Sequence, residues 1–219
     1  MKCRPLRKML RFYFITDDNA PSCPPIQQTR IALGAGATMI QYRNKSFSDA
    51  FLPEILQIRW LCSEWGIPLV INDDIGLAER VGADGIHVGQ EDISPTVARQ
   101  RLGGEAIIGV SVSNLDELRN TDLSSCDYIG TGPIFPTGTK TDAKAVKGLS
   151  GLKAIVDAAP LPVVAIGGIT AHNTRACLDT GAAGIAVISF ISRAPDPKAN
   201  AVVLGQACGI FESHQSQNP

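Results

Sequence analysis

Asp127-Tyr128-Ile129-Gly130 opens the stretch that decides the fold, and Thr131-Gly132-Pro133-Ile134-Phe135-Pro136-Thr137-Gly138-Thr139-Lys140 completes it. The first four residues predict a short buried strand. The remainder is a long polar loop with two glycines, two prolines, three threonines and one lysine. Such a loop directly after a strand is more typical of a binding loop than of a connector, and its hydroxyls, amides and ammonium suit a phosphorylated ligand. An ordinary Gly/Pro turn is the alternative interpretation.

The same order of strand and loop recurs along the chain, with helical patterns between the strands. Apolar runs predict further strands at 12–16, 39–42, 69–71, 85–88, 107–111, 162–166 and 184–188. Helical signals fall at 26–33, 48–65, 75–81, 115–123, 151–159, 173–180 and 196–211, and Ser94-Pro95 opens one more helix. Strands that alternate with helices imply a parallel sheet. Eight such units in about 200 residues predict an α/β fold with a single (β/α)₈ TIM barrel.

An open, doubly wound sheet is the competing architecture. It would carry a G-x-G-x-x-G motif after the first strand, and the sequence has none there. The 219 residues fit one barrel domain at 12–211, with a frayed basic tail at 1–11 and a disordered tail at 212–219.

Composition restricts the partners and the compartment. The formal net charge of -1 argues against nucleic acid as the main partner. The chain carries neither a secretory signal nor a membrane-spanning run. Six scattered cysteines without a C-x-x-C pair predict reduced thiols in a cytoplasmic protein. The sequence is compatible with a homo-oligomer and does not fix the oligomeric state.

Polar residues follow the predicted strands. In a barrel these positions converge on one face, where the active site lies. They are Gln41, Arg43 and Lys45 at and beyond the end of the second strand, Asn72 and Asp73 after the third, Asp92 after the fourth, Ser111 at the end of the fifth, Thr137, Thr139 and Lys140 after the sixth, Gly167 and Gly168 after the seventh, and Ser189 at the end of the eighth. Gln41, Arg43 and Lys45 alternate, so an extended backbone would point all three the same way.

The charged members of this set suggest a diphosphate and a metal. Arg43, Lys45 and Lys140 are cations, and Asp73 and Asp92 are carboxylates. The carboxylates are either paired with the cations or hold Mg²⁺, which combines one or two carboxylates with phosphate oxygens of a substrate. A diphosphate–metal unit accounts for both signs of charge. Mn²⁺ accepts the same oxygen ligands, so the choice between the two ions stays open.

A second phosphate position is predicted after the last two strands. Gly167, Gly168 and Ser189 match the phosphate site that many barrels build there, although two glycines also suit a tight turn. His87 lies among strand residues and is interpreted as a core histidine rather than a base. Because no Ser-His-Asp or Cys-His arrangement stands out, the chemistry predicted is positioning and charge stabilisation.

Several motifs in order resemble the thiamine-phosphate synthase family over Phe12 to Ile191. They are Ile15-Thr16-Asp17, Gln41-x-Arg43-x-Lys45, Ile71-Asn72-Asp73, His87-Val88-Gly89-Gln90-Glu91-Asp92, Gly109-Val110-Ser111, Gly130-x-Gly132-Pro133-Ile134-Phe135-Pro136-Thr137-x-Thr139-Lys140, Ile166-Gly167-Gly168-Ile169 and Val187-Ile188-Ser189. The resemblance implies a transferase that joins 4-amino-5-hydroxymethyl-2-methylpyrimidine diphosphate to 4-methyl-5-(2-hydroxyethyl)thiazole phosphate. It also implies a dissociative reaction, in which diphosphate leaves, a pyrimidine methyl cation forms, and the thiazole nitrogen attacks it.

The resemblance also implies residue roles. The pyrimidine diphosphate would be held by Gln41, Arg43, Lys45, Asn72, Ser111 and Lys140, of which Arg43, Lys45, Ser111 and Lys140 are the catalytic candidates. Asp73 and Asp92 would bind Mg²⁺. The thiazole phosphate would be held by Thr137, Thr139, Gly168, Ile188 and Ser189.

Three other functions remain open from the sequence. A thiazole tautomerase of the same superfamily would use a histidine just after the fifth strand, where this chain has Ser111-Val112-Ser113. A non-catalytic sensor of thiamine phosphate would need the same pocket without turnover. A phosphate-binding barrel isomerase is compatible with the fold alone, which does not fix function.

Overall fold

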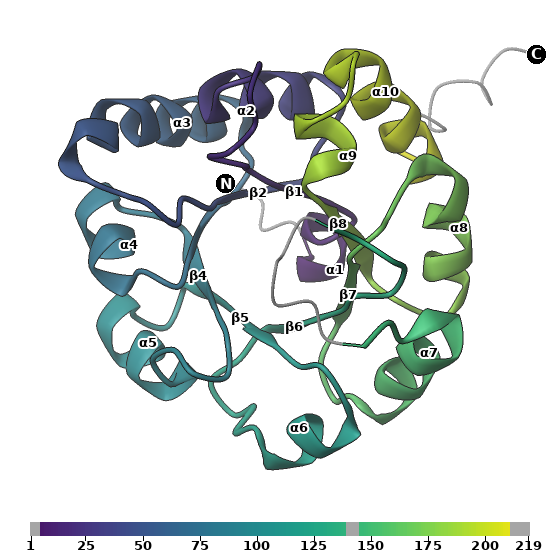
Figure 1. The fold of residues 1–219 in the computed structure, drawn as a ribbon. Helices are drawn as coiled ribbons and strands as arrows, with labels where there is room; N and C mark the ends of the chain where they lie inside the picture. Colours follow the sequence, from purple (N-terminus) through teal and green to yellow (C-terminus); the bar gives the residue numbers. More distant parts are fainter. Residues whose placement is uncertain (1–4, 139–144, 211–219) are drawn as a thin grey trace, which may run out of the picture.

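Eight parallel strands form a closed barrel in the computed structural model, which describes residues 5–138 and 145–210. Figure 1 shows the ring of strands inside a ring of helices. The strands are β1 (Phe12–Ile15), β2 (Met39–Tyr42), β3 (Leu69–Asn72), β4 (Gly85–Val88), β5 (Ile107–Ser111), β6 (Tyr128–Thr131), β7 (Val163–Ile166) and β8 (Gly184–Val187). Each strand pairs with the next in sequence, and β8 pairs with β1. The predicted (β/α)₈ architecture is confirmed, and the open sheet is excluded.

Helices surround the barrel and follow its strands along the chain, except for α1, which precedes β1 (Figure 1). They are α1 (Leu6–Met9), α2 (Pro25–Gly34), α3 (Leu52–Trp65), α4 (Ile75–Val81), α5 (Pro95–Leu102), α6 (Leu115–Asn120), α7 (Gly148–Ala158), α8 (Ala171–Asp179), α9 (Ser189–Ser192) and α10 (Pro197–Ala207), with a 3₁₀ turn, η1, at Asp49–Phe51. The sequence predicts neither α1 nor α9, and Ser189 begins α9 instead of ending β8. No helix within 5–138 and 145–210 is both long and apolar enough to span a membrane.

The alternation of side chains along the strands divides the apolar core in two. Tyr13 and Ile15 point into the barrel, where they join one cluster of buried residues. Phe12 and Phe14, on the same strand, point outward into the larger cluster between strands and helices. Successive side chains of a strand face opposite sides of the sheet, so one apolar run supplies both cores.

The N-terminal segment closes the end of the barrel opposite the strand-end loops. In Figure 1, α1 lies within the ring of strands. Leu10 is completely buried and belongs to the cluster inside the barrel. Arg7 donates to the Gly181 carbonyl, and Arg11 Nε donates to the Cys208 carbonyl over 2.8 Å. The expectation of a frayed tail at 1–11 is therefore wrong for its described part, because apolar residues fill the barrel floor.

A repeated side-chain contact joins neighbouring strands at their N-terminal ends. The residue just before β2, β4 or β6 accepts a hydrogen bond from the first backbone N–H groups of the preceding strand. The pairs are Thr38 with Phe12 at 2.9 Å, Asp84 with Leu69 at 2.8 Å, and Asp127 with Ile108 at 2.7 Å. These bonds pair backbone donors where the ladder begins, and so help to fix the register of the barrel.

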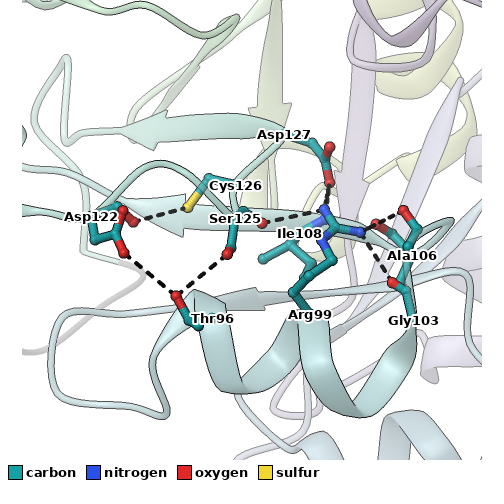
Figure 2. A network of polar contacts seen from close by, with 10 residues as sticks. Thr96, Arg99, Gly103, Ala106, Ile108, Asp122, Ser125, Cys126 and Asp127 are labelled. Atoms are coloured by element: carbon teal, nitrogen blue, oxygen red, sulfur yellow. Dashed lines mark hydrogen bonds and ion pairs between the residues drawn. The ribbon is translucent and has the colours of Figure 1, made fainter.

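Arg99 extends one of these contacts into a network (Figure 2). Its guanidinium donates to Asp127 at 2.7 Å, to the Ser125 carbonyl at 3.2 Å, and to the carbonyls of Gly103, Gly104 and Ala106 at 3.2, 2.9 and 2.5 Å. One side chain of α5 thereby ties the loop that enters β5 to the loop that enters β6. The candidate site lies at the opposite ends of the strands.

Candidate active site

Two adjoining chambers occupy the face where the strands end. The outer chamber has a volume of about 690 Å³ and the inner chamber about 200 Å³. They share part of their lining, including Lys45, Asp73, Asp92 and Ser111. The outer volume lies in the range typical of small-molecule sites, and the inner chamber extends it into the barrel.

Strand β2 and the residues after it supply one wall of the inner chamber. Gln41, Arg43 and Lys45 all line it, as their alternation predicted, and Asn72 lines it from β3. The backbone continues in this direction because the Arg43 N–H donates to Thr16 Oγ1 over 2.9 Å. The apolar part of the lining is Ile15, which pairs with Gln41 in the sheet, together with Val164, Ile166, Ala186 and Ile188. The chamber therefore combines polar groups with apolar side chains that suit a flat ring.

Asp73 and Asp92 face each other where the two chambers meet. Lys45 Nζ lies 2.9 Å from Asp73 Oδ2, and Asn72 Nδ2 donates to the same oxygen over 2.5 Å. Asp92 Oδ2 accepts from the Gly89 N–H over 2.7 Å. Asp73 has a φ of 62°, and it is the one non-glycine residue with positive φ among those the structure describes. Such strained conformations are concentrated at functional sites.

The pKa values of the two carboxyl groups are shifted in opposite directions. Burial alone would raise the pKa of Asp73, but the Lys45 ammonium and other hydrogen bonds hold that pKa below its ordinary value. Burial raises the pKa of Asp92, and the negative charge of Asp73 raises it further. Two carboxylates in contact repel each other, so a cation bound between them would be stabilised.

The donor set fits a hard cation that takes ligands from its substrate. Within the described ranges, no group of three or more histidine, cysteine or acidic side chains could enclose a metal. Two carboxylates beside an open chamber suit Mg²⁺, which keeps waters and accepts phosphate oxygens, and do not suit a closed zinc cage.

Glycines at the end of β7 let the loop after β6 lie against that strand. Gly167 and Gly168 have φ values of 94° and 65°, and a Cβ atom on Gly168 would stand 2.7 Å from both Phe135 Cβ and the Pro136 carbonyl oxygen. The Phe135 N–H donates to the Gly167 carbonyl over 3.0 Å. This contact carries Thr137 to the outer chamber.

The residues predicted for the thiazole phosphate come together in part. Thr137, Gly168, Ile188 and Ser189 all line the outer chamber, and Ile188 also lines the inner one. Thr139 and Lys140 lie outside the described residues. Phe190 and Ser113, which follow two of the predicted positions, also line the outer chamber.

A chain of hydrogen bonds runs beneath the inner chamber. Gln41 Nε2 donates to Tyr13 Oη over 2.8 Å, and the two tyrosine oxygens, of Tyr13 and Tyr128, are 2.9 Å apart. Tyr128 Oη lies 3.0 Å from His87 Nδ1, and His87 Nε2 lies 2.9 Å from Ser111 Oγ. Both ring nitrogens of His87 thus have partners, as a core histidine requires, but the ring also lines the inner chamber.

Sequence reasoning misses the two tyrosines of this chain. Their one signal is a phenolic side chain at an inward position of a strand that is otherwise apolar. Tyr13 is 2 % exposed and Tyr128 is fully buried. Burial raises the pKa of each tyrosine well above its ordinary value, so both hydroxyls keep their protons at neutral pH.

Comparisons with known proteins agree with this geometry. The family model described as thiamine monophosphate synthase matches residues 12–191. A thiamine-phosphate synthase of Bacillus velezensis is 39 % identical over 201 residues, which cover 90 % of this chain and 89 % of that protein. A thiamine-phosphate synthase of Geobacillus thermodenitrificans is 40 % identical over 207 residues, covering 92 % and 93 %.

A solved structure is similar over nearly the whole length. Thiamine phosphate pyrophosphorylase from Pyrococcus furiosus superposes with a TM-score of 0.83 at 37 % identity, covering 94 % of this chain and 98 % of that one. A shared barrel fold alone would not give a family-model match over residues 12–191 or sequence identities of 37 to 40 %. The chain belongs to the thiamine monophosphate synthase family.

Proposed function

We propose that this chain forms thiamine phosphate by joining the pyrimidine diphosphate to the thiazole phosphate, with release of diphosphate. The observation that carries the proposal is a cluster of cations and carboxylates at the junction of two chambers. A diphosphate bound at this junction would leave one ring in the inner chamber and the acceptor in the outer one. The reaction is proposed from family membership, and the charged groups at the junction explain how the chain would bind the diphosphate.

The inner chamber suits the aminopyrimidine ring. Its apolar wall, which includes Val164 and Ile166, would contact the flat face of the ring, while Gln41 and Ser111 offer hydrogen bonds at the edge. Arg43, Lys45 and Asn72 line the same chamber, where they would hold the diphosphate. Cations and amides placed this way stabilise negative charge as it develops on a leaving group.

Asp73 and Asp92 would hold Mg²⁺ at the junction. When bound, the metal would neutralise charge on the departing diphosphate. Lys45 contributes in two ways, since it contacts Asp73 in the absence of substrate and carries a charge that a diphosphate attracts. Lys140 is proposed as a further cation on the diphosphate.

The outer chamber suits the thiazole phosphate. The backbone around Gly168 can approach a phosphate closely because the residue has no side chain, and the Thr137 and Ser189 hydroxyls would add donors. Thr139 and Ile188 complete the proposed set. A phosphate held here would direct the thiazole nitrogen toward the junction and the ring beyond it.

The proposed reaction is dissociative. The C–O bond to the diphosphate breaks first, and both electrons of that bond leave with the diphosphate. The pyrimidine methyl cation that remains is attacked by the thiazole nitrogen. Water would capture such a cation, and the apolar side chains that line the inner chamber would help to exclude it.

One experiment separates the candidate functions. The protein is incubated with both substrates and Mg²⁺, and the products are identified by mass analysis together with free diphosphate. Thiamine phosphate and diphosphate in equal amounts are expected, with loss of both when EDTA is added. Binding of thiamine phosphate without turnover would instead identify a sensor, and isomerised thiazole without condensation would identify a tautomerase.

We place the enzyme in the cytoplasm, since the described cysteines are all free.

A further inference from the structure

The hydrogen-bond chain from Gln41 to Ser111 has a direction that follows from counting its hydrogens. Gln41 Nε2 donates to Tyr13 Oη, so the Tyr13 hydroxyl must give its own hydrogen to Tyr128. Tyr128 then gives its hydrogen to His87 Nδ1, which leaves the histidine hydrogen on Nε2. That hydrogen goes to Ser111 Oγ. With Gln41 oriented in this way, the opposite direction would leave the buried Tyr13 hydrogen without an acceptor.

We infer that Tyr13, Tyr128 and His87 are positioning residues that set the polarity of the two hydrogen bonds offered to the substrate ring. In this direction, Gln41 keeps its carbonyl oxygen and Ser111 keeps its hydroxyl hydrogen for the chamber. Within the described part of the chain, no protein hydrogen bond reaches Gln41 Oε1. The pocket thus presents one acceptor, Gln41 Oε1, and one donor, the Ser111 hydroxyl, at the two ends of the hydrogen-bond chain.

Two glycines make room for the chain. A Cβ atom on Gly109 would stand 2.1 Å from Tyr128 Cζ and 2.5 Å from His87 Nδ1. A Cβ atom on Gly130 would stand 3.0 Å from His87 Cε1. These inward positions of β5 and β6 therefore admit no larger residue without displacing the rings. The missing side chains of Gly109 and Gly130 thus leave the space that the Tyr128 and His87 rings occupy inside the barrel.

This polarity selects an amino group over a carbonyl, and the inference here rests on the proposed function. A 4-aminopyrimidine would donate an N–H to Gln41 Oε1 and would offer an acceptor to the Ser111 hydroxyl. The matching 4-oxopyrimidine would turn a carbonyl oxygen toward Gln41 Oε1, and two acceptors repel each other. Sites that hydrogen-bond a substrate group discriminate strongly against analogues that leave their groups unpaired.

Tyr128→Phe tests the chain at its middle. Without the Tyr128 oxygen, the Tyr13 hydroxyl loses its acceptor and can satisfy itself only by donating to the Gln41 carbonyl, which inverts the amide. The ratio of kcat/KM for the 4-amino diphosphate to that for the 4-oxo diphosphate should then fall about tenfold or more. Tyr42→Phe is the matched control, because Tyr42 is equally buried and its hydroxyl contacts Asn44 outside the chain. Its ratio should equal that of the unaltered protein.

An equal loss of activity on both substrates in Tyr128→Phe, with the ratio unchanged, would overturn the inference, because a merely structural role predicts that result. A second measurement uses the unaltered protein without substrate, so it does not depend on whether a variant folds. Nitrogen NMR of the unaltered protein should find His87 protonated on Nε2 and not on Nδ1, and the reverse tautomer would also overturn it. If the protein instead makes no thiamine phosphate from the amino substrate, the proposed function fails, while the tautomer still tests the chain.

Discussion

Asp73 combines a left-handed backbone with a half-buried, paired carboxylate, and this combination is the strongest residue-level sign of function. A left-handed conformation strains any side chain other than glycine, and it persists where neighbouring contacts hold it. Here Lys45 and Asn72 hold the carboxylate, and Asp92 faces it from the next strand. This conformation and the facing Asp92 carboxylate together support the proposed cation site.

We therefore predict that Asp73→Asn and Asp92→Asn each lower kcat/KM by at least about a hundredfold. Each should also weaken Mg²⁺ binding in the presence of the pyrimidine diphosphate, as measured by calorimetry, while the unfolding temperature stays close to that of the unaltered protein. The matched control is Asp74→Asn. Asp74 caps α4 by accepting from the Leu77 N–H, and asparagine caps helices equally well. Near-normal turnover of either site variant at limiting Mg²⁺ would remove that residue from the metal site.

Gly168 is a second residue whose role the structure refines. A Cβ atom at this position would meet Phe135 and Pro136 of the loop after β6. Gly168→Ala should therefore displace the loop that carries Thr137 and lower kcat/KM for the thiazole phosphate about tenfold or more, with pyrimidine diphosphate binding preserved. Gly66→Ala is the control, because Gly66 has nearly the same φ with open space around it. If Gly66→Ala harms activity equally, backbone strain alone explains both variants.

At the scale of elements, the Arg99 network stabilises the loops that enter β5 and β6. Removing it leaves the Asp127 carboxylate and four carbonyls without a charged donor. Arg99→Ala should lower the free energy of unfolding by roughly 2 kcal/mol, measured by urea denaturation. Arg119→Ala should have a far smaller effect, since the Arg119–Asp116 pair is exposed on one helix. Equal losses in the two variants would mean that the network of Figure 2 contributes nothing beyond a surface ion pair.

The elements themselves could be predicted where local pattern decides them. Each strand is a short apolar run bounded by turn residues, so its position follows from the sequence within one or two residues. Helices α1 and α9 have four residues each, too few for a helical period to be visible. Both form because of contacts distant in sequence, α1 on the barrel floor and α9 beside the loop after β1.

At the scale of the whole molecule, the barrel explains why most of the site could be predicted. Every strand delivers its C-terminal end to one face, so polar residues at those ends meet regardless of their separation in sequence. Gln41, Asp73 and Ser111 follow from this rule alone. Tyr13 and Tyr128 do not, because they lie inside the barrel, and their contact joins strands 115 residues apart that do not pair. No local pattern carries that information.

A buried carboxylate joins the first and last parts of the barrel beside the β1–β8 pairing that closes it. Asp17, just after β1, is 2 % exposed and receives hydrogen bonds from Arg193 at 2.6 and 3.2 Å and from Ser192 at 3.1 Å. Burial alone would raise the pKa of Asp17, but Arg193 and the other donors hold it below its ordinary value. The contact anchors α9, and with it Ser189, against the loop after β1.

Because the folded pKa of Asp17 is depressed, its contribution to stability is present above the unfolded pKa, about 3.9, and is lost as the pH falls through the folded value. Asp17→Asn should therefore lower the free energy of unfolding by roughly 2 kcal/mol at pH 7, and the difference from the unaltered protein should narrow steadily below pH 4. Urea denaturation at pH 7, 5 and 3 measures this. Asp179→Asn breaks an exposed pair with Arg175 and should differ little from the unaltered protein at any pH. A difference for Asp17→Asn that stays constant down to pH 3 would mean that shape, and not the carboxylate charge, joins the two ends of the barrel.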